Sequence, residues 1–245
     1  MKARRKHSQD EVRTLAAAVA RLSKMLTRDR EHLPANYLQD SELRTAYVRY
    51  FLPVNRAKIH IPLKDLSLHP ARFLSGSSLR VLDIGTGPGT SVLGIIDYFR
   101  GGSTQPALEF MAMDAVPGNL REAERLFKDA IADYRSVVSL KTSIRLFGAS
   151  SERIEGTYDL IVLSNVLNEL FPDKPDRTSR RAAILSDLLK TSLAETGACI
   201  IIEPSLRETS RDLQSVRDEL IRTGFTIYSP CLMQEPCPAL VNPRD

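Results

Sequence analysis

Hydrophobic and polar residues follow a helical period in the first part of the chain. Apolar residues recur there at steps of three and four, which predicts one amphipathic helix over about residues 9–28. The recurring positions are Val12, Leu15, Ala16, Val19, Leu22 and Leu26. A second helical stretch runs from Ser41 to Phe51 and is expected to stop at Pro53, because proline lacks the N–H group that continues a helix.

From Leu79 onward, short apolar runs alternate with helical stretches. This alternation is typical of a parallel sheet with helices on both faces. The predicted strands are Leu79–Ile84, Leu108–Asp114, Ser143–Phe147, Tyr158–Asn165, Ala198–Glu203 and Phe225–Ser229. The predicted helices lie near 90–99, 117–133, 178–193 and 209–223. We therefore expect an α/β fold with a doubly wound, Rossmann-like sheet.

The same pattern divides the chain into three parts. Residues 1–75 are expected to form a helical N-terminal extension, residues 76–230 the sheet domain, and residues 231–245 a tail that contains cysteine and proline. A length of 245 residues suits one α/β domain with a modest extension. No apolar run approaches the roughly 20 residues of a membrane helix. Three cysteines are too few for a disulfide scaffold. A soluble protein in a reducing, intracellular compartment is therefore expected.

The net charge of +4 is concentrated at the N-terminus. Residues 1–30 hold nine Lys and Arg against three Asp and Glu, which leaves +6 there and −2 for the remainder. A basic arm can neutralise phosphates and favour RNA binding through counterion release. A solvated helix face explains the same charges equally well.

The predicted chemistry centres on a glycine-rich turn after the first strand, where backbone can approach a ligand without interference from Cβ. The turn reads Asp83, Ile84, Gly85, Thr86, Gly87, Pro88, Gly89. A dinucleotide fingerprint would need glycine in place of Thr90, and a Walker loop would need a following Gly-Lys-Ser/Thr. The carboxylate of Asp83 suits a cationic ammonium better than a pyrophosphate. The turn resembles the first motif of class I S-adenosylmethionine (SAM)-dependent methyltransferases, which implies that it binds the methionine end of SAM.

Two further strand ends are consistent with this resemblance. Asp114, 25 residues after Gly89, ends the second predicted strand, where its two oxygens can accept hydrogen bonds from both ribose hydroxyls. Capping of the next helix is the alternative role for Asp114. At the end of the fourth strand, Asn165 is predicted to bind the cofactor, and Asn168 and Glu169 are substrate-pocket candidates. A turn or cap explains these last two residues equally well, and no catalytic residue is predicted.

A closer resemblance covers roughly residues 33–243. The segments that carry it are Pro34–Leu38, Ala46–Asn55, Leu82–Thr90, Ser164–Leu170, Ile202–Pro204 and Ser229–Pro238. They are similar to the ribosomal-small-subunit-associated methyltransferase-like proteins of bacteria and mitochondria. The resemblance implies a SAM-binding fold and a partner in the small ribosomal subunit or its rRNA. It also implies a cytoplasmic location, or a mitochondrial one in a eukaryote, and in some members an iron–sulfur cluster.

The implied cluster would be held by four cysteines. Only Cys231 and Cys237 match as metal ligands here, and two thiolates do not complete a four-cysteine set. Cys199 lies in an apolar strand and is expected to be an inert core thiol.

The methyltransferase resemblance implies seven strands, whereas only six are predicted. Four prolines follow Ser229, which argues against a central strand there. We therefore expect the seventh strand to be missing, with the chain truncated relative to its relatives or completed by a partner. Such an arrangement would expose a strand edge.

Three functions are compatible with these patterns. The first is a SAM-dependent methyltransferase that acts on or beside small-subunit rRNA, mainly by aligning the two reactants. The second is a non-catalytic assembly factor that keeps the SAM-binding fold. The third is a small-molecule methyltransferase with the N-terminal helices as its lid. The oligomeric state and the target atom stay open.

Overall fold

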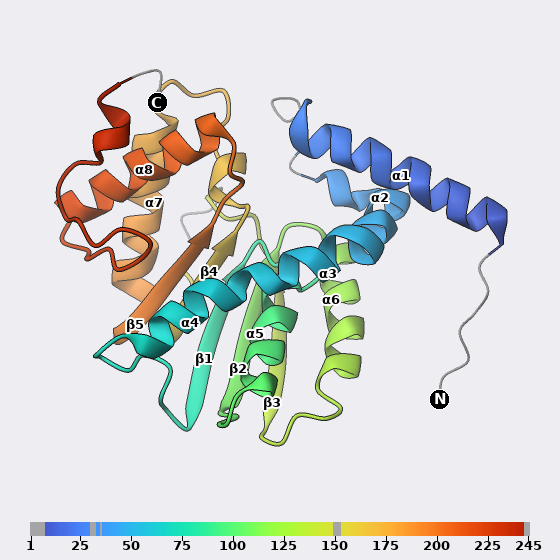
Figure 1. The fold of residues 1–245 in the computed structure, drawn as a ribbon, viewed down its shortest axis with the longest axis horizontal. Helices are drawn as coiled ribbons and strands as arrows, with labels where there is room; N and C mark the ends of the chain where they lie inside the picture. Colours follow the sequence, from blue (N-terminus) through green and yellow to red (C-terminus); the bar gives the residue numbers. More distant parts are fainter. Residues whose placement is uncertain (1–7, 30–32, 35, 149–152, 243–245) are drawn as a thin grey trace.

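A five-stranded, all-parallel sheet forms the centre of the computed structural model, which describes residues 8–29, 33–34, 36–148 and 153–242. The strand order is β3-β2-β1-β4-β5. The strands are β1 (Ser78–Ile84), β2 (Ala107–Asp114), β3 (Val138–Ile144), β4 (Tyr158–Ser164) and β5 (Leu193–Ile202). The helices that cover the sheet are α5 (Thr90–Gly101), α6 (Pro117–Ala130), α7 (Arg177–Ser192) and α8 (Arg207–Arg222) (Figure 1). The expected doubly wound α/β fold is confirmed.

The central strands are apolar along their length because both of their faces are covered. Val81 and Leu160 belong to the core cluster that α5 helps to form, whereas Leu82 and Ile161 belong to the cluster on the other face, with α7 and α8. All four side chains are fully buried. Burial on this scale is the main favourable contribution to folding.

The first helix, α1 (Gln9–Thr27), lies within a residue of the span that the apolar period predicts. It begins with a capping box, in which the Ser8 hydroxyl accepts the backbone N–H of Glu11 and the Glu11 carboxylate accepts that of Ser8. Ala18 and Leu22 are buried in a cluster that also contains Leu93 of α5. The extension therefore shares a core with the sheet domain, and the division at residues 75 and 230 stays a prediction.

A continuous helical rod connects α1 to the sheet. It consists of α2 (Ser41–Ala46), a π-helical turn (Tyr47–Phe51), α3 (Leu52–Asn55), a 3-10 turn (Arg56–Ile59) and α4 (His60–Leu68). The expected stop at Pro53 is wrong. Pro53 is the second residue of α3. In the first turn of a helix the N–H groups have no partner within that helix, so the missing N–H of proline costs no hydrogen bond there. The π turn makes this possible, because the Leu52 N–H bonds to the Tyr47 carbonyl.

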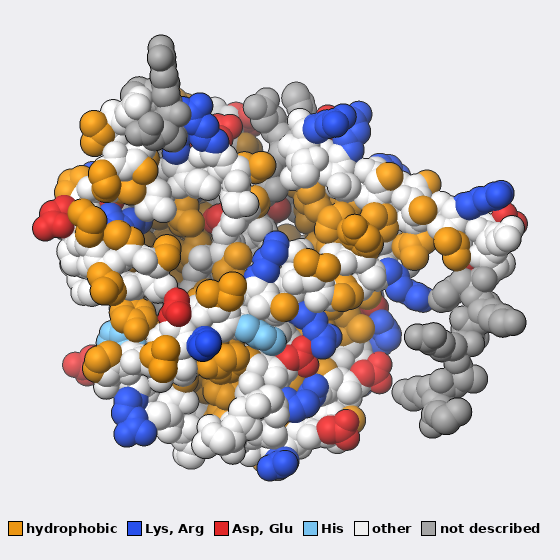
Figure 2. Space-filling view, viewed as in Figure 1, with side chains coloured by type: hydrophobic (Ala, Val, Ile, Leu, Met, Phe, Trp, Pro, Cys, Tyr) orange, Lys and Arg blue, Asp and Glu red, His pale blue; other side chains and the backbone are white. Residues whose placement is uncertain are grey.

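The outer face of this rod is partly apolar. Tyr50, Val54, Ile61 and Leu68 are between 58% and 72% exposed. In Figure 2, hydrophobic side chains gather over the N-terminal helices on this face of the molecule. None of the helices in the described ranges combines the length and apolarity needed to cross a membrane.

Two strand predictions are wrong. The third strand is Val138–Ile144 rather than Ser143–Phe147, because Val138 and Leu140 pack on the core while residues 145–147 leave the sheet. Phe225–Ser229 is not a strand, and the described residues form no strand after β5. The side-chain amide of Gln234 bonds both the N–H and the carbonyl of Ile227, so a side chain takes the place of a neighbouring strand.

The tail that follows is held on α8 through its main chain. Arg217 donates to the carbonyls of Met233 and Glu235, and Arg211 donates to those of Ala239, Leu240 and Asn242. The Asp218 carboxylate accepts the N–H of Cys237 at 2.9 Å. These bonds fix the course of residues 233–242 along one helix.

Gly94 of α5 sets how closely the rod packs on the sheet domain. A Cβ at this position would lie 2.3 Å from the carbonyl oxygen of Arg56 and 2.6 Å from Cγ2 of Ile59. We expect Gly94→Ala to lower the free energy of unfolding by about 1–3 kcal/mol, because the rod would have to shift. Denaturant unfolding measures this change.

Gly101, at the end of the same helix, is the matched control, because a Cβ there would meet nothing within 4 Å. Gly101→Ala should be neutral or stabilising, since alanine favours a helix more than glycine does. Equal destabilisation by the two variants would contradict the close packing at Gly94.

Candidate functional site

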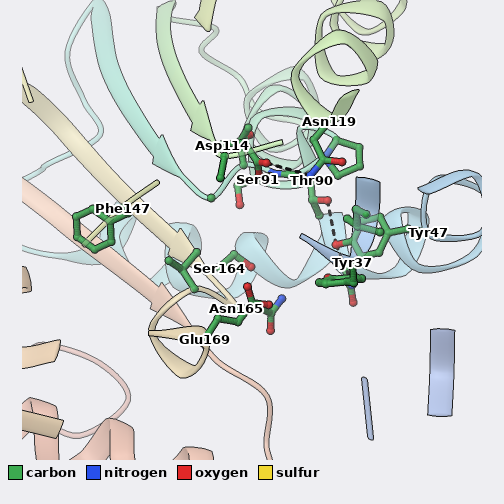
Figure 3. Close-up of a pocket in the computed structure, with 18 of the residues that line it drawn as sticks. Tyr37, Tyr47, Thr90, Ser91, Asp114, Asn119, Phe147, Ser164, Asn165 and Glu169 are labelled. Carbon is green, nitrogen blue, oxygen red and sulfur yellow. Dashed lines mark hydrogen bonds between the residues drawn. The ribbon is translucent and has the colours of Figure 1, made fainter. Parts of the chain in front are cut away.

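A cavity of about 290 Å³ lies at the C-terminal ends of β1, β2 and β4 (Figure 3). This is where the strand order reverses, between β1 and β4, the place at which open α/β sheets bind ligands. Of the residues predicted to form a site, those that line it are Gly85, Thr86, Gly87, Asp114, Asn165 and Glu169. The structure therefore brings together the glycine turn, the end of β2 and the segment after β4.

The glycine turn has a backbone that only glycine adopts easily. Gly85, Gly87 and Gly89 have φ values of +63°, +55° and +86°. A Cβ on Gly85 would lie 2.5 Å from Cγ2 of Val166, whereas a Cβ on Gly87 would meet no atom within 4 Å. Gly85 thus permits close packing of two loops, and Gly87 leaves a space in the cavity that a side chain would fill. Gly89 is the N-cap of α5 and packs on Ala123 of α6.

Asp83 lies beneath this turn and does not itself line the cavity. It is 1% exposed, and its Oδ2 accepts the Thr86 hydroxyl at 2.6 Å. Burial raises the pKa of Asp83 to about 7, and the charge of Asp114 adds to this rise, whereas hydrogen bonds from Thr86, Ser91 and Val92 oppose it. A buried carboxyl group therefore supports the glycine turn and the start of α5.

Asp114 ties the end of β2 to the glycine turn and to α6. Its Oδ2 accepts the N–H of Gly87 at 2.9 Å, and its Oδ1 accepts the N–H of Val116 and the side-chain amide of Asn119. Burial raises the pKa of Asp114, and these three bonds oppose the rise. A carboxylate accepts about four hydrogen bonds. One acceptor position is therefore left. The bonds to Val116 and Asn119 agree with the capping interpretation, and the ribose interpretation stays a prediction.

The N-terminal extension lines one side of the cavity, where the third candidate function places a lid, but none of its lining residues was predicted. Tyr47 is buried, with its hydroxyl 3.3 Å from that of Thr90 and 3.5 Å from the side-chain amide of Asn55. Burial raises the pKa of Tyr47. Other lining residues that the sequence analysis missed are Tyr37, Phe51, Lys58, Arg145 and Phe147. The aromatic residues at 37, 47 and 51 lie in segments quoted for the family resemblance, which is the one signal that pointed to them.

The segment after β4 contributes to the cavity through some of its side chains. Asn165 has a φ of +59°, a left-handed conformation that asparagine tolerates better than most residues. Asn165 and Glu169 line the cavity and lie close to each other in Figure 3. Asn168 is not among the lining residues, because its side-chain amide donates to Glu203 instead. The structure thus places one of the two substrate-pocket candidates outside the cavity.

The predicted metal ligands lie apart from this cavity. Cys231 is exposed and Cys237 is half-buried, in the tail that packs on α8. Within the described ranges, no group of three or more His, Cys, Asp or Glu side chains is arranged to hold a metal ion. Burial raises the pKa of the Cys199 thiol to about 12, as expected for an inert thiol against the core.

The sheet order, the glycine turn and the cavity define the class of this protein: it has the fold of the class I SAM-dependent methyltransferases. The family described as mitochondrial small ribosomal subunit Rsm22 matches residues 40–245, which is most of the chain. The chain therefore belongs to the Rsm22 family.

Several solved structures of methyltransferases are similar to this chain at low sequence identity. The CurJ carbon methyltransferase has a TM-score of 0.47 and 18% identity, and the match covers 84% of this chain and 51% of that one. The plantazolicin methyltransferase BpumL has a TM-score of 0.46 and 14% identity, and the match covers 84% of this chain and 66% of that one. A SAM-dependent methyltransferase of Methanosarcina mazei has a TM-score of 0.36 and 17% identity, and the match covers 49% of this chain and 52% of that one. The chain thus spans between about half and two thirds of these proteins. A search of curated proteins found no match.

The buried Asp83 makes stability depend on pH. Its pKa is about 7 in the folded protein, against an ordinary value of 3.8 that applies to the unfolded chain. Folding therefore becomes less favourable as the pH rises from about 4 to about 7. Two pKa units between pH 5 and pH 7 correspond to about 2.7 kcal/mol. We expect Asp83→Asn to gain about this much free energy of unfolding over the wild type when the pH is raised from 5 to 8.

Unfolding in urea at both pH values measures this difference between the variants. The contributions of other titrating groups are the same in both proteins and cancel in the difference. Asp129→Asn, at an exposed position of α6, is the control and should show no such gain. A wild type and an Asp83→Asn variant with parallel pH profiles would mean that Asp83 is already ionised at pH 5.

Proposed function

We propose that this protein binds SAM in the cavity and acts as a methyltransferase on or beside the small ribosomal subunit. The observation that carries the proposal is the open space over Gly87, next to Asp114, at the end of the sheet where ligands of this fold bind. Membership of the Rsm22 family supports the ribosomal partner. We expect the protein in the compartment of that ribosome, which is the cytoplasm in a bacterium and the mitochondrion in a eukaryote.

The residues present fit SAM in three respects. The space over Gly87 allows a ligand to approach the backbone of the turn. Asp83, buried directly beneath the turn and bonded to the cavity-lining Thr86, places a carboxyl group near the proposed position of the ammonium of the methionine moiety. Asp114 keeps one acceptor position for a ribose hydroxyl, and accepting a second would require the Gly87 N–H to give up its bond. Asn165 would border the methionine end.

Bound SAM would supply a methyl group on a sulfonium, which is already a good leaving group. The protein then has to align the acceptor with this methyl group and exclude water. Glu169 and Asn165 line the side of the cavity formed by the segment after β4, and Tyr47 and Phe51 line the side formed by the rod. Glu169 is the lining carboxylate best placed to orient a polar acceptor or to take its proton.

Binding of S-adenosylhomocysteine (SAH) tests the site. We expect calorimetry to show SAH binding by the wild type and at least tenfold weaker binding by Asp114→Asn. The amide would place a donor against the Gly87 N–H, and a hydrogen bond to a charged group contributes about 1.5–3 kcal/mol. Asp129→Asn on the same helix as Asn119 should bind like the wild type. Binding of a nicotinamide dinucleotide instead of SAH would overturn the proposal.

Co-sedimentation with purified small ribosomal subunits tests the partner. Removal of residues 1–7 takes away Lys2, Arg4, Arg5 and Lys6 but leaves the Ser8 cap and the buried face of α1. We expect weaker co-sedimentation, with a smaller dependence on salt, and unchanged SAH affinity. A wild type that does not co-sediment would contradict the ribosomal partner.

Labelled SAM then separates the candidate functions. Transfer of label to the RNA of immature small subunits supports the enzyme. Retained SAH binding and co-sedimentation without transfer would favour the non-catalytic assembly factor. Transfer to small molecules without co-sedimentation would favour the third function.

A further inference from the structure

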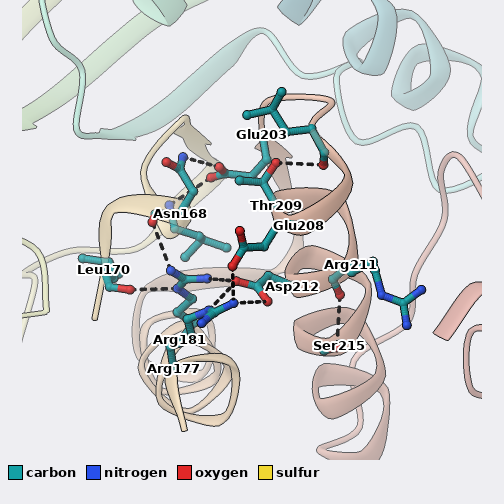
Figure 4. Close-up of polar contacts among 12 residues, drawn as sticks. Asn168, Leu170, Arg177, Arg181, Glu203, Glu208, Thr209, Arg211, Asp212 and Ser215 are labelled. Atoms are coloured by element: carbon teal, nitrogen blue, oxygen red, sulfur yellow. Dashed lines mark hydrogen bonds and ion pairs between the residues drawn. The ribbon is translucent and has the colours of Figure 1, made fainter. Parts of the chain in front are cut away.

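Charged side chains hold the segment of residues 165–171, the post-β4 loop, from two sides (Figure 4). On one side is Glu203, which directly follows β5. Its Oε1 accepts the backbone N–H groups of Val166 at 3.1 Å and Leu167 at 2.9 Å, and its Oε2 accepts the side-chain amide of Asn168. One carboxylate thus satisfies three donors at the start of the loop.

On the other side is Arg181 of α7, which is 3% exposed. Its Nη2 donates to the carbonyl of Asn168 at 3.0 Å, and its Nε donates to that of Leu170 at 2.9 Å. Its Nη1 donates to Asp212 of α8 at 2.7 Å, and the same carboxylate accepts from Arg177. The guanidinium is therefore fixed in place while it binds main-chain acceptors of the loop.

The loop needs this support because its conformation is not an easy one. Asn165 and Phe171, at its two ends, both have φ in the left-handed region, at +59° and +54°. Residues in that region cost free energy and persist only where the surroundings determine them. Neither Glu203 nor Arg181 lines the cavity, but Asn165 and Glu169 of the loop do.

The loop also touches the glycine turn. Val166, whose N–H bonds Glu203, occupies the space that a Cβ on Gly85 would need. A carboxylate at the end of β5 therefore acts on the turn after β1 through one residue. Asp114 holds the turn separately, through its bond to the N–H of Gly87.

We propose that Glu203 and Arg181 are positioning residues for the amino-acid end of the cofactor: by fixing the main chain of the post-β4 loop, they set the wall that faces the methionine moiety. This deepens the proposed function and rests on SAM being the ligand. Burial of a charged group such as Arg181 is unfavourable unless the group is paired and its hydrogen bonds are well satisfied. Geometric precision of this kind is what a binding wall requires.

The test compares two ligands. 5′-Methylthioadenosine carries the adenosine part of SAH without the amino-acid end. We expect Glu203→Ala to weaken SAH binding tenfold or more, and methylthioadenosine binding by no more than about threefold. Equal weakening of both ligands would show a merely structural role and overturn the proposal, and so would unchanged affinity for both.

A reciprocal exchange keeps the test valid where Glu203→Ala fails to fold. Asn168→Asp sets a second carboxylate against Glu203 and should weaken SAH binding. Adding Glu203→Gln restores a donor opposite an acceptor, while the glutamine oxygen still accepts the two backbone N–H groups. We expect the double variant to recover SAH affinity to within about threefold of the wild type. A double variant as weak as Asn168→Asp alone would overturn the proposal.

Two arginine substitutions supply a matched pair. Arg181→Lys keeps the charge but not the two fixed donors and should weaken SAH binding selectively. Arg222→Lys changes an arginine of α8 that pairs with Glu219 on the surface, and this variant should bind like the wild type. Equal effects of the two would overturn the proposal. A wild type that binds no SAH removes the proposed function, whereas a wild type that binds it with unaffected variants removes only this inference.

Discussion

The close approach of the glycine turn to the post-β4 loop is the contact on which the rest of the site depends. It exists because Gly85 has no Cβ and Val166 fills the space. The parallel pairing of β1 with β4 brings the two segments to the same edge of the sheet. Any larger residue at 85 would separate the loops, and the cavity wall would lose its shape. A missing side chain is thus as much a part of this site as the polar groups around it.

The cavity is completed by a part of the chain that lies outside the sheet. The rod packs on α5 through Gly94 and brings Tyr47 against Thr90, the first residue of that helix. The same rod buries Leu63 and Leu66 in the core beside the sheet. The helical rod and the sheet therefore form one packed unit. A ligand in the cavity would contact residues that are far apart in sequence but joined by a common core.

Much of the sheet and its glycine turn could be predicted from the sequence, because strong local signals specify them. Buried parallel strands are apolar along their length, and positive φ values require glycine, so β1, β2, β4 and the turn at 85–89 are readable. β3 was misplaced because it is an edge strand in which three of seven residues are exposed and none is fully buried, so its apolar period is weak. The side-chain bonds of Gln234, which replace a strand at 225–229, leave no periodic signal.

The candidate site was predictable only in part for the same reason. Asp114 ends β2, and Asn165 and Glu169 come shortly after β4. The C-terminal ends of parallel strands meet at one edge of the sheet, so the place of these residues in the cavity follows from topology. The side chain of Asn168 turns towards Glu203, and the direction of a side chain in a loop depends on contacts that sequence spacing does not encode. Tyr47 reaches the cavity through the packing of a separate helix, which no local pattern shows.

The attachment of the tail to α8 has a consequence for the cysteines. The side chains of Arg211, Arg217 and Asp218 form hydrogen bonds with main-chain groups of the tail, which do not depend on the side chains of the tail residues. Apart from Gln234, whose side chain bonds Ile227, the residues of the tail can therefore change their side chains without loss of these bonds. Thiols at positions 231 and 237 can be exchanged for hydroxyls while the scaffold that presents them keeps its form, so redox or metal chemistry at these two positions can be separated experimentally from architecture.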